Sequence, residues 1–108
     1  MKVELKSKDV PMTRTLVEQA ERRLRYALQG FGDRVQRVRL HLSGDESQPN
    51  GAGYRCRIQA QTDQGAVVLI EERRRHPVTA VVIASEHIAR RVGQRLQKLS
   101  GRRRPTRS

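Results

Sequence analysis

Residues 54–72 read YRCRIQAQTDQGAVVLIEE, and this stretch decides the kind of fold that the chain adopts. From residue 54 to residue 60, apolar residues alternate with arginine or glutamine, which is the period of a strand with one buried face. Asp63-Gln64-Gly65 predicts a short turn, and the stretch from Ala66 to Glu72, rich in β-branched residues and bounded by charge, predicts the second strand of a hairpin. The stretch therefore predicts an antiparallel sheet that buries one of its faces.

Two more strands and two helices precede and follow this hairpin. Residues 2–7 and 37–42 alternate in the same way, and residues 43–53 are rich in turn formers. Apolar residues at helical spacing predict one helix up to residue 31, with Thr13 as N-cap and Gly30 and Gly32 as stop. A second helix is expected from Pro77 in its first turn to Gly101 at its end.

The expected element order is therefore β-α-β-β-β-α. Because each strand has one apolar face and each helix an apolar arc of about 120°, we expect an α+β sandwich of two layers. Its four-stranded mixed sheet carries both helices on one face, with the first two strands parallel if they are adjacent. Residues 1–100 form this domain, and residues 101–108 are expected to be a disordered basic tail.

The charge balance points to a polyanionic partner. The 108 residues include 23 Lys+Arg and 11 Asp+Glu, which leaves a net charge of +12. Only four of the basic residues are lysines, and the planar guanidinium of arginine suits phosphates and bases. A G+C-rich genome would produce the same bias, so this preference has two readings.

Several classes of protein are disfavoured. The longest apolar run, residues 66–70, is too short to cross a bilayer, and no signal peptide is visible, so we expect a cytoplasmic protein. Cys56 is the only cysteine and is expected to be a buried structural thiol. His41, His76 and His87 are scattered over different elements. We therefore expect no enzyme, no metal or other cofactor and no small-molecule substrate.

Basic residues gather on one flank of the second predicted helix. Arg91, Arg95, Lys98 and Arg102 are spaced by four, three and four residues, and Arg23 lies on the equivalent flank of the first helix. Such a ridge can follow a phosphate backbone. The same residues can also be a solvated flank whose aliphatic stems cover the edge of the core. Both readings are open from the spacing alone.

A second basic surface is expected on the sheet. The side chains that should point away from the core include Arg37, Arg39, Arg55 and Arg57. Like charges on neighbouring strands cost stability, so these arginines suggest an external anion. The alternative is a solvated face that acidic residues of other strands relieve, and the candidates are Glu4, Glu71 and Glu72.

From Thr13 onward the element order matches the double-stranded-RNA-binding module, with one strand added in front. Over residues 1–100 the chain resembles the ribosome hibernation promoting factor family, also called ribosome-associated inhibitor or sigma-54 modulation proteins. The resemblance rests on the order and spacing of five pieces: Val10-x-x-Thr13-x-x-Leu16, Phe31-Gly32-Asp33-Arg34-Val35-x-Arg37-Val38, His41-Leu42-Ser43, Arg55-Cys56-x-Ile58-x-Ala60 and Ala89-Arg90-Arg91-Val92. The middle pieces are most similar to a divergent proteobacterial branch. Long family members carry a second, dimerising domain, and we expect this chain to be a short form.

The resemblance implies a stress-response factor that docks on the small ribosomal subunit, in the channel for messenger and transfer RNA. There it would block translation and protect idle ribosomes, and we expect a monomer off the ribosome. Arg23 and Arg90 match basic positions of the family, whereas Tyr26, Gln94 and Leu96 stand where relatives often have lysine. The residues expected to bind ribosomal RNA are Arg23, Arg25, Arg90, Arg91, Arg95, Lys98, Arg102 and Arg103.

Two other functions are compatible with the sequence. One is a general basic module that binds RNA or DNA without preference for the ribosome, which would show a steep salt dependence and no preference for folded subunits. The other is a regulatory protein-interaction module. That function would need an exposed apolar patch, and the sequence shows no such patch beyond the expected core.

Overall fold

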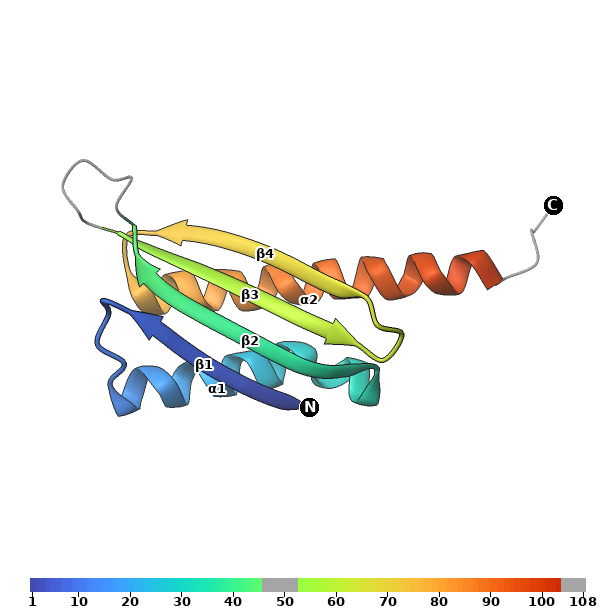
Figure 1. The fold of residues 1–108 in the computed structure, drawn as a ribbon, viewed down its shortest axis with the longest axis horizontal. Helices are drawn as coiled ribbons and strands as arrows, with labels where there is room; N and C mark the ends of the chain where they lie inside the picture. Colours follow the sequence, from blue (N-terminus) through green and yellow to red (C-terminus); the bar gives the residue numbers. More distant parts are fainter. Residues whose placement is uncertain (46–52, 104–108) are drawn as a thin grey trace.

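The computed structural model describes residues 1–45 and 53–103, with side chains as far as residue 97. Figure 1 shows the elements along the chain. They are β1 (Lys2–Lys8), α1 (Arg14–Leu28), the 3-10 helix η1 (Gln29–Arg34), β2 (Val35–Gly44), β3 (Tyr54–Thr62), β4 (Val67–Arg74) and α2 (Pro77–Arg103). No helix among these residues is long and apolar enough to cross a membrane.

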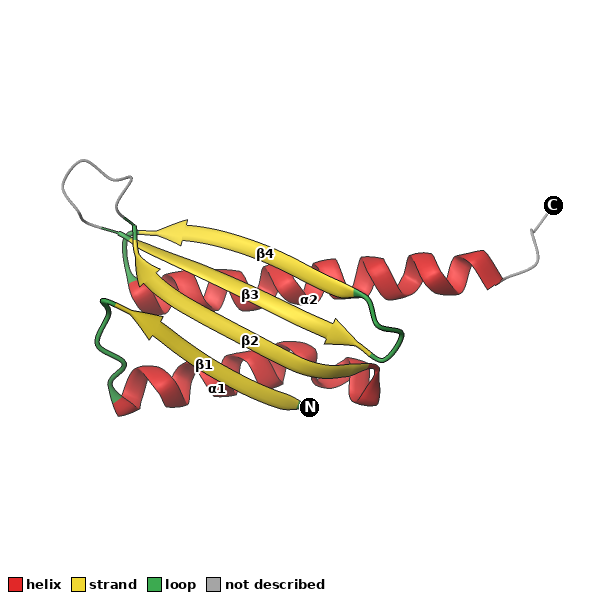
Figure 2. Ribbon diagram, in the orientation of Figure 1, coloured by secondary structure: helices red, strands yellow, loops and turns green. Residues whose placement is uncertain are grey.

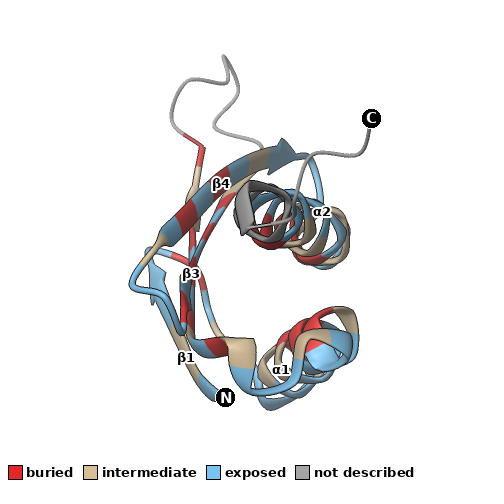
Figure 3. Cartoon of the chain, turned by 90° about the vertical axis from the view of Figure 1, so that its right-hand side faces the viewer, coloured by how far each residue is buried: buried red, intermediate tan, exposed pale blue. Residues whose placement is uncertain are grey.

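The four strands form one sheet in the order β1-β2-β3-β4. β1 and β2 are parallel, whereas β2–β3 and β3–β4 are antiparallel. Both helices cover the same face of this sheet, which leaves the other face open (Figures 2 and 3). The two-layer α+β sandwich with a mixed sheet is therefore confirmed.

The core lies between the sheet and the helices. Strand alternation places Leu40, Ile58 and Ile70 opposite one another on three neighbouring strands, and all three are buried. Leu24 of α1 and Ile88 of α2 close the core from the helical side, and neither has any exposed surface. Because side chains alternate along a strand, this register sends the intervening arginines to the open face.

The first helix begins as predicted and ends earlier. Thr13 is its N-cap, and the Thr13 Oγ1 accepts a hydrogen bond from the Leu16 backbone N–H at 3.2 Å. α1 ends at Leu28, and η1 continues the chain to a break at Gly32, whose φ of 56° favours glycine. Phe31, expected in the helix, lies in η1, where its ring packs against Gly93 of α2.

Two boundaries in the second half of the chain were wrong. Arg73 and Arg74, expected in a connection, extend β4 because they pair with Arg55 and Tyr54 of β3. Gly101, expected to stop the second helix, lies inside α2, which runs to Arg103. One glycine lowers helix stability by only about 1 kcal/mol and does not by itself end a helix. The rest of the expected disordered tail, residues 104–108, lies outside the described residues.

Truncation of a core side chain tests the packing. Leu24→Ala should lower the free energy of unfolding by about 2–5 kcal/mol, because the cavity opens in a close-packed layer. Leu69→Ala removes the same atoms from a leucine that is 55% exposed on the open face, and should cost less than about 1 kcal/mol. Urea denaturation followed by circular dichroism measures both. Equal losses in the two variants would contradict this placement of the core.

Candidate nucleic-acid interface

Five exposed arginines of the two helices lack an acidic partner. Among the described side chains, no ion pair within 4.0 Å involves Arg22, Arg23, Arg90, Arg91 or Arg95. The other two arginines of α1 are paired, Arg14 with Glu18 and Arg25 with Glu21. An unpaired guanidinium gives up only water when it binds a phosphate, so these five are the helical cations best placed to hold an external anion.

The first unpaired arginines lie in a groove between α1 and α2. Eight side chains line this groove, which has a volume of about 410 Å³: Leu16, Gln19, Arg22, Arg23, Tyr26, Val78, Val81 and Val82. The valines and the leucine give it an apolar floor, while the two arginines make its rim cationic. Tyr26 is 70% exposed. An apolar floor beside cations and an aromatic ring suits a nucleotide, whose base is planar and whose phosphate is negative.

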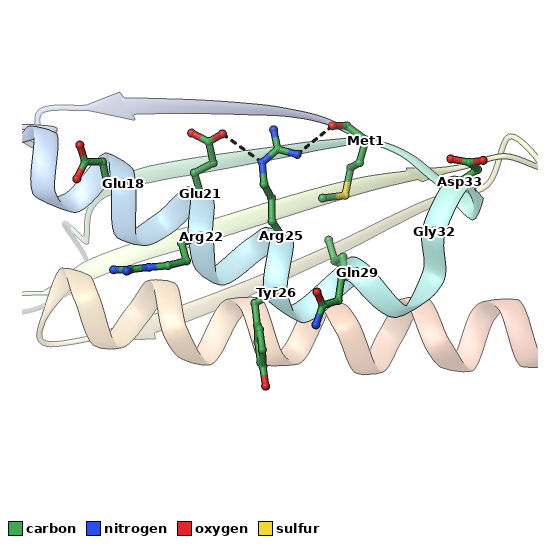
Figure 4. A pocket seen from close by; sticks show the side chains of 10 residues that line it. Met1, Glu18, Glu21, Arg22, Arg25, Tyr26, Gln29, Gly32 and Asp33 are labelled. Carbon is green, nitrogen blue, oxygen red and sulfur yellow. Dashed lines mark hydrogen bonds and ion pairs between the residues drawn. The ribbon is translucent and has the colours of Figure 1, made fainter.

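Arg25 lies on the other flank of α1. Figure 4 shows Arg25 and Glu21 on the side of β1, whereas Tyr26 extends toward α2. The Arg25 Nε donates to Glu21 Oε1 at 3.2 Å, and the Arg25 Nη1 donates to the Met1 carbonyl oxygen at 3.4 Å. Arg25 therefore ties the start of β1 to α1. It lies away from Arg23 because residues two positions apart do not share a face of a helix.

Arg91 and Arg95 lie at a different place, between α2 and the edge strand β4. With Gln94 they line a hollow of about 380 Å³ against Val67, Val68 and Leu69. Four residues of helix rise about 6 Å along the axis, so the two arginines form a short line of charge, as predicted. Arg90, the next residue along, is exposed. Within the expected RNA-binding set, Arg91 and Arg95 thus lie at the α2–β4 edge, whereas Arg23 lies at the inter-helix groove.

The remaining expected residues fall at the end of α2. Arg102 and Arg103 belong to its last turn, but the described side chains stop before them and before Lys98. Arg22 was not predicted, although it lines the groove together with Arg23. The sequence does indicate that Arg22 is exposed, because it lies outside the apolar arc of the helix. Which side of α1 faces α2 could not be read from the spacing alone.

Cys56 has no place in this interface. It is fully buried on β3, and burial together with the nearby Glu72 carboxylate raises its pKa from 9.0 to about 12. This confirms the expectation of a buried thiol. Glu72 also forms an ion pair with Arg74, whose Nη2 lies 2.9 Å from its carboxylate. The second carboxylate oxygen of Glu72 lies 2.6 Å from His87 Nδ1, and this contact links β4 to α2. In the described part of the chain, no cluster of His, Cys, Asp or Glu is arranged to hold a metal ion.

The raised pKa predicts an inert thiol. At pH 8 a thiol with a pKa of about 12 carries about a thousand times less thiolate than one at 9.0, and the thiolate is the reactive form. We expect iodoacetamide to leave Cys56 unmodified in the native protein and to modify it fully in denaturant, as measured by intact mass. Rapid alkylation of the native chain at pH 8 would contradict the buried placement.

No protein-family model matches the sequence, and no curated protein resembles it significantly. Among solved structures, the N-terminal domain of protein Y from Thermus thermophilus is similar, with a TM-score of 0.71 at 19% identity over 87% of this chain and 98% of that one. The chain therefore has the fold of this domain.

A second structure supports the same assignment. A ribosomal subunit interface protein from Coxiella burnetii has a TM-score of 0.76 at 10% identity, over 90% of this chain and 99% of that one. Both similarities extend over nearly the whole of the known structures. At identities this low they show the fold alone, and at that level they confirm the resemblance read from the sequence.

Proposed function

We propose that this chain binds the small ribosomal subunit in the channel for messenger and transfer RNA, and so silences idle ribosomes as a hibernation factor. One observation carries the proposal: five exposed arginines, without acidic partners among the described side chains, project from the helical layer of a fold shared with a ribosomal subunit interface protein. The arginines bind phosphates of ribosomal RNA, and the chain acts in the cytoplasm, where the ribosomes are. The chain acts as a monomer and performs no chemical step.

In this proposal the helical residues make two kinds of contact with ribosomal RNA. Arg91 and Arg95 at the α2–β4 edge follow the phosphate backbone, and the helix end with Lys98, Arg102 and Arg103 extends this line. Arg23, with Arg22 and Tyr26, holds a nucleotide at the inter-helix groove. Arg90 adds positive charge on the exposed side of α2. Arg25 contributes indirectly, because its hydrogen bond to the Met1 carbonyl oxygen anchors the start of β1 to α1. Inhibition follows because the bound domain fills the space that messenger and transfer RNA need.

A protein-interaction role has one observation in its favour. Val67 and Leu69 on the edge strand β4 are 52% and 55% exposed. A stable protein interface buries about 1,200 Å² or more of surface in total. Two aliphatic side chains supply only a small part of that area. The helical arginines give stronger complementarity to RNA, so RNA is the partner that we favour.

The charge reversal Arg91→Glu with Arg95→Glu tests the proposal. It should weaken binding to purified small subunits at least about tenfold at moderate salt, and lower the slope of log affinity against log salt by about two. The matched control is Arg104→Glu with Arg107→Glu, which makes the same change in net charge in the tail. We expect the control to lose less than about threefold, because non-specific attraction is shared among many charges.

Two results would contradict the proposal. Equal losses in both double variants would mean that diffuse attraction alone drives binding. Equal affinity of the unmodified chain for small subunits, naked duplex RNA and DNA would support the general nucleic-acid module instead. Initiator transfer RNA provides a test of the location, since it should displace the chain from the subunit if both occupy the same channel.

A further inference from the structure

The open face of the sheet, which we call the outer sheet face, carries a large excess of positive charge. The lysines and arginines that point to this side are Lys2, Lys6, Lys8, Arg37, Arg39, Arg55, Arg57 and Arg73. The acids on the same face, within the described strands, are Glu4 and Glu71. Eight cations against two carboxylates leave an excess of six charges, before His41 is counted.

Each of the two carboxylates is shared among three cations. Glu4 lies 3.2 Å from Arg39 Nε and 3.9 Å from Arg37 Nε, with the Lys2 Nζ at 4.0 Å. The acids therefore relieve part of the repulsion, as one reading of the sequence expected. A single negative charge cannot neutralise three positive ones, so each cluster keeps a net positive charge.

The second cluster repeats this arrangement at the other side of the sheet. Glu71 lies 3.3 Å from both Arg57 Nη2 and Arg73 Nη2, and 4.0 Å from Arg55 Nη1. Arg55 and Arg73 are directly opposite each other on β3 and β4. Like charges in this position destabilise a sheet, and an anion that spans them would offset the repulsion.

The C-terminal half of β1, beyond the first cluster, carries cations without an acidic partner among the described side chains. Lys6 and Lys8 of β1 take part in no ion pair among the described side chains. Lys8, His41, Arg55 and Arg57 line a hollow of about 370 Å³ together with Asp9 and the buried Asp45. The face thus offers a continuous series of donors from β1 to β4 rather than isolated ion pairs.

We propose that the outer sheet face binds a second segment of RNA backbone, so that one chain bridges two RNA segments. This rests on the proposed RNA partner and adds a surface on the opposite side of the sheet from the helices (Figure 3). Apolar side chains on this face are confined to Val67 and Leu69 in the described strands. Protein interfaces need a more apolar core, whereas a phosphate backbone needs donors and positive charge.

The number of RNA segments bound by one chain tests the inference. Analytical ultracentrifugation with a short RNA hairpin should give a complex of one chain with two hairpins. Lys6→Glu with Lys8→Glu changes two exposed lysines that hold no ion pair, and should weaken the second hairpin at least about tenfold at moderate salt. The same variant should lower the salt slope for subunit binding by about two. The tail variant Arg104→Glu with Arg107→Glu again matches the change in net charge.

Arg39→Gln with Arg57→Gln is the second test, because it neutralises one arginine of each cluster without adding an acid beside Glu4 or Glu71. It should also reduce the stoichiometry toward one hairpin, with circular dichroism confirming the fold. One hairpin per chain at saturation, or unchanged subunit affinity in both sheet variants, would overturn the inference. The proposed function fails separately, if Arg91→Glu with Arg95→Glu leaves subunit binding intact.

Discussion

The alternation of the four strands is the constraint on which the rest of the structure depends. Leu40, Leu42 and Ile58 must face the helices, so the arginines between them must face solvent. Only 35% of the residues are hydrophobic, and the described core fills one layer between sheet and helices. The basic side chains are therefore distributed over two surfaces, the exposed surface of the helices and the outer sheet face. A single packing requirement separates the two basic surfaces.

The elements could be predicted because their periods are local. Strand alternation, the Thr13 cap and Pro77 in the first turn of α2 each involve residues within a few positions of one another. The end of α2 was mispredicted because a glycine permits a stop without requiring one. β4 was extended by pairing with β3, and that pairing is a tertiary contact which the composition of Arg73 and Arg74 does not signal.

The candidate site was predictable in part for the same reason. Helical spacing placed Arg91 and Arg95 on one flank, and the structure brings them into one hollow. Arg23 and Arg25 are two residues apart, so the helix places them on different sides, whereas the contact of Arg25 with the Met1 carbonyl oxygen involves another element and could not be predicted from the spacing. On the sheet, the sharing of Glu4 and Glu71 among arginines of other strands depends on the strand register, since these residues are far apart in sequence. Contacts between residues of different elements are the features of the site that could not be predicted from residue spacing.

The partner that we propose is the folded small subunit rather than nucleic acid in general. Sedimentation of the tagged chain through a sucrose gradient with separated small and large subunits tests it most directly. We expect the chain to migrate with the small subunit at moderate salt and to return to the top of the gradient at high salt, because phosphate contacts weaken with salt. Equal distribution between the two subunits, or no migration with either, would contradict it.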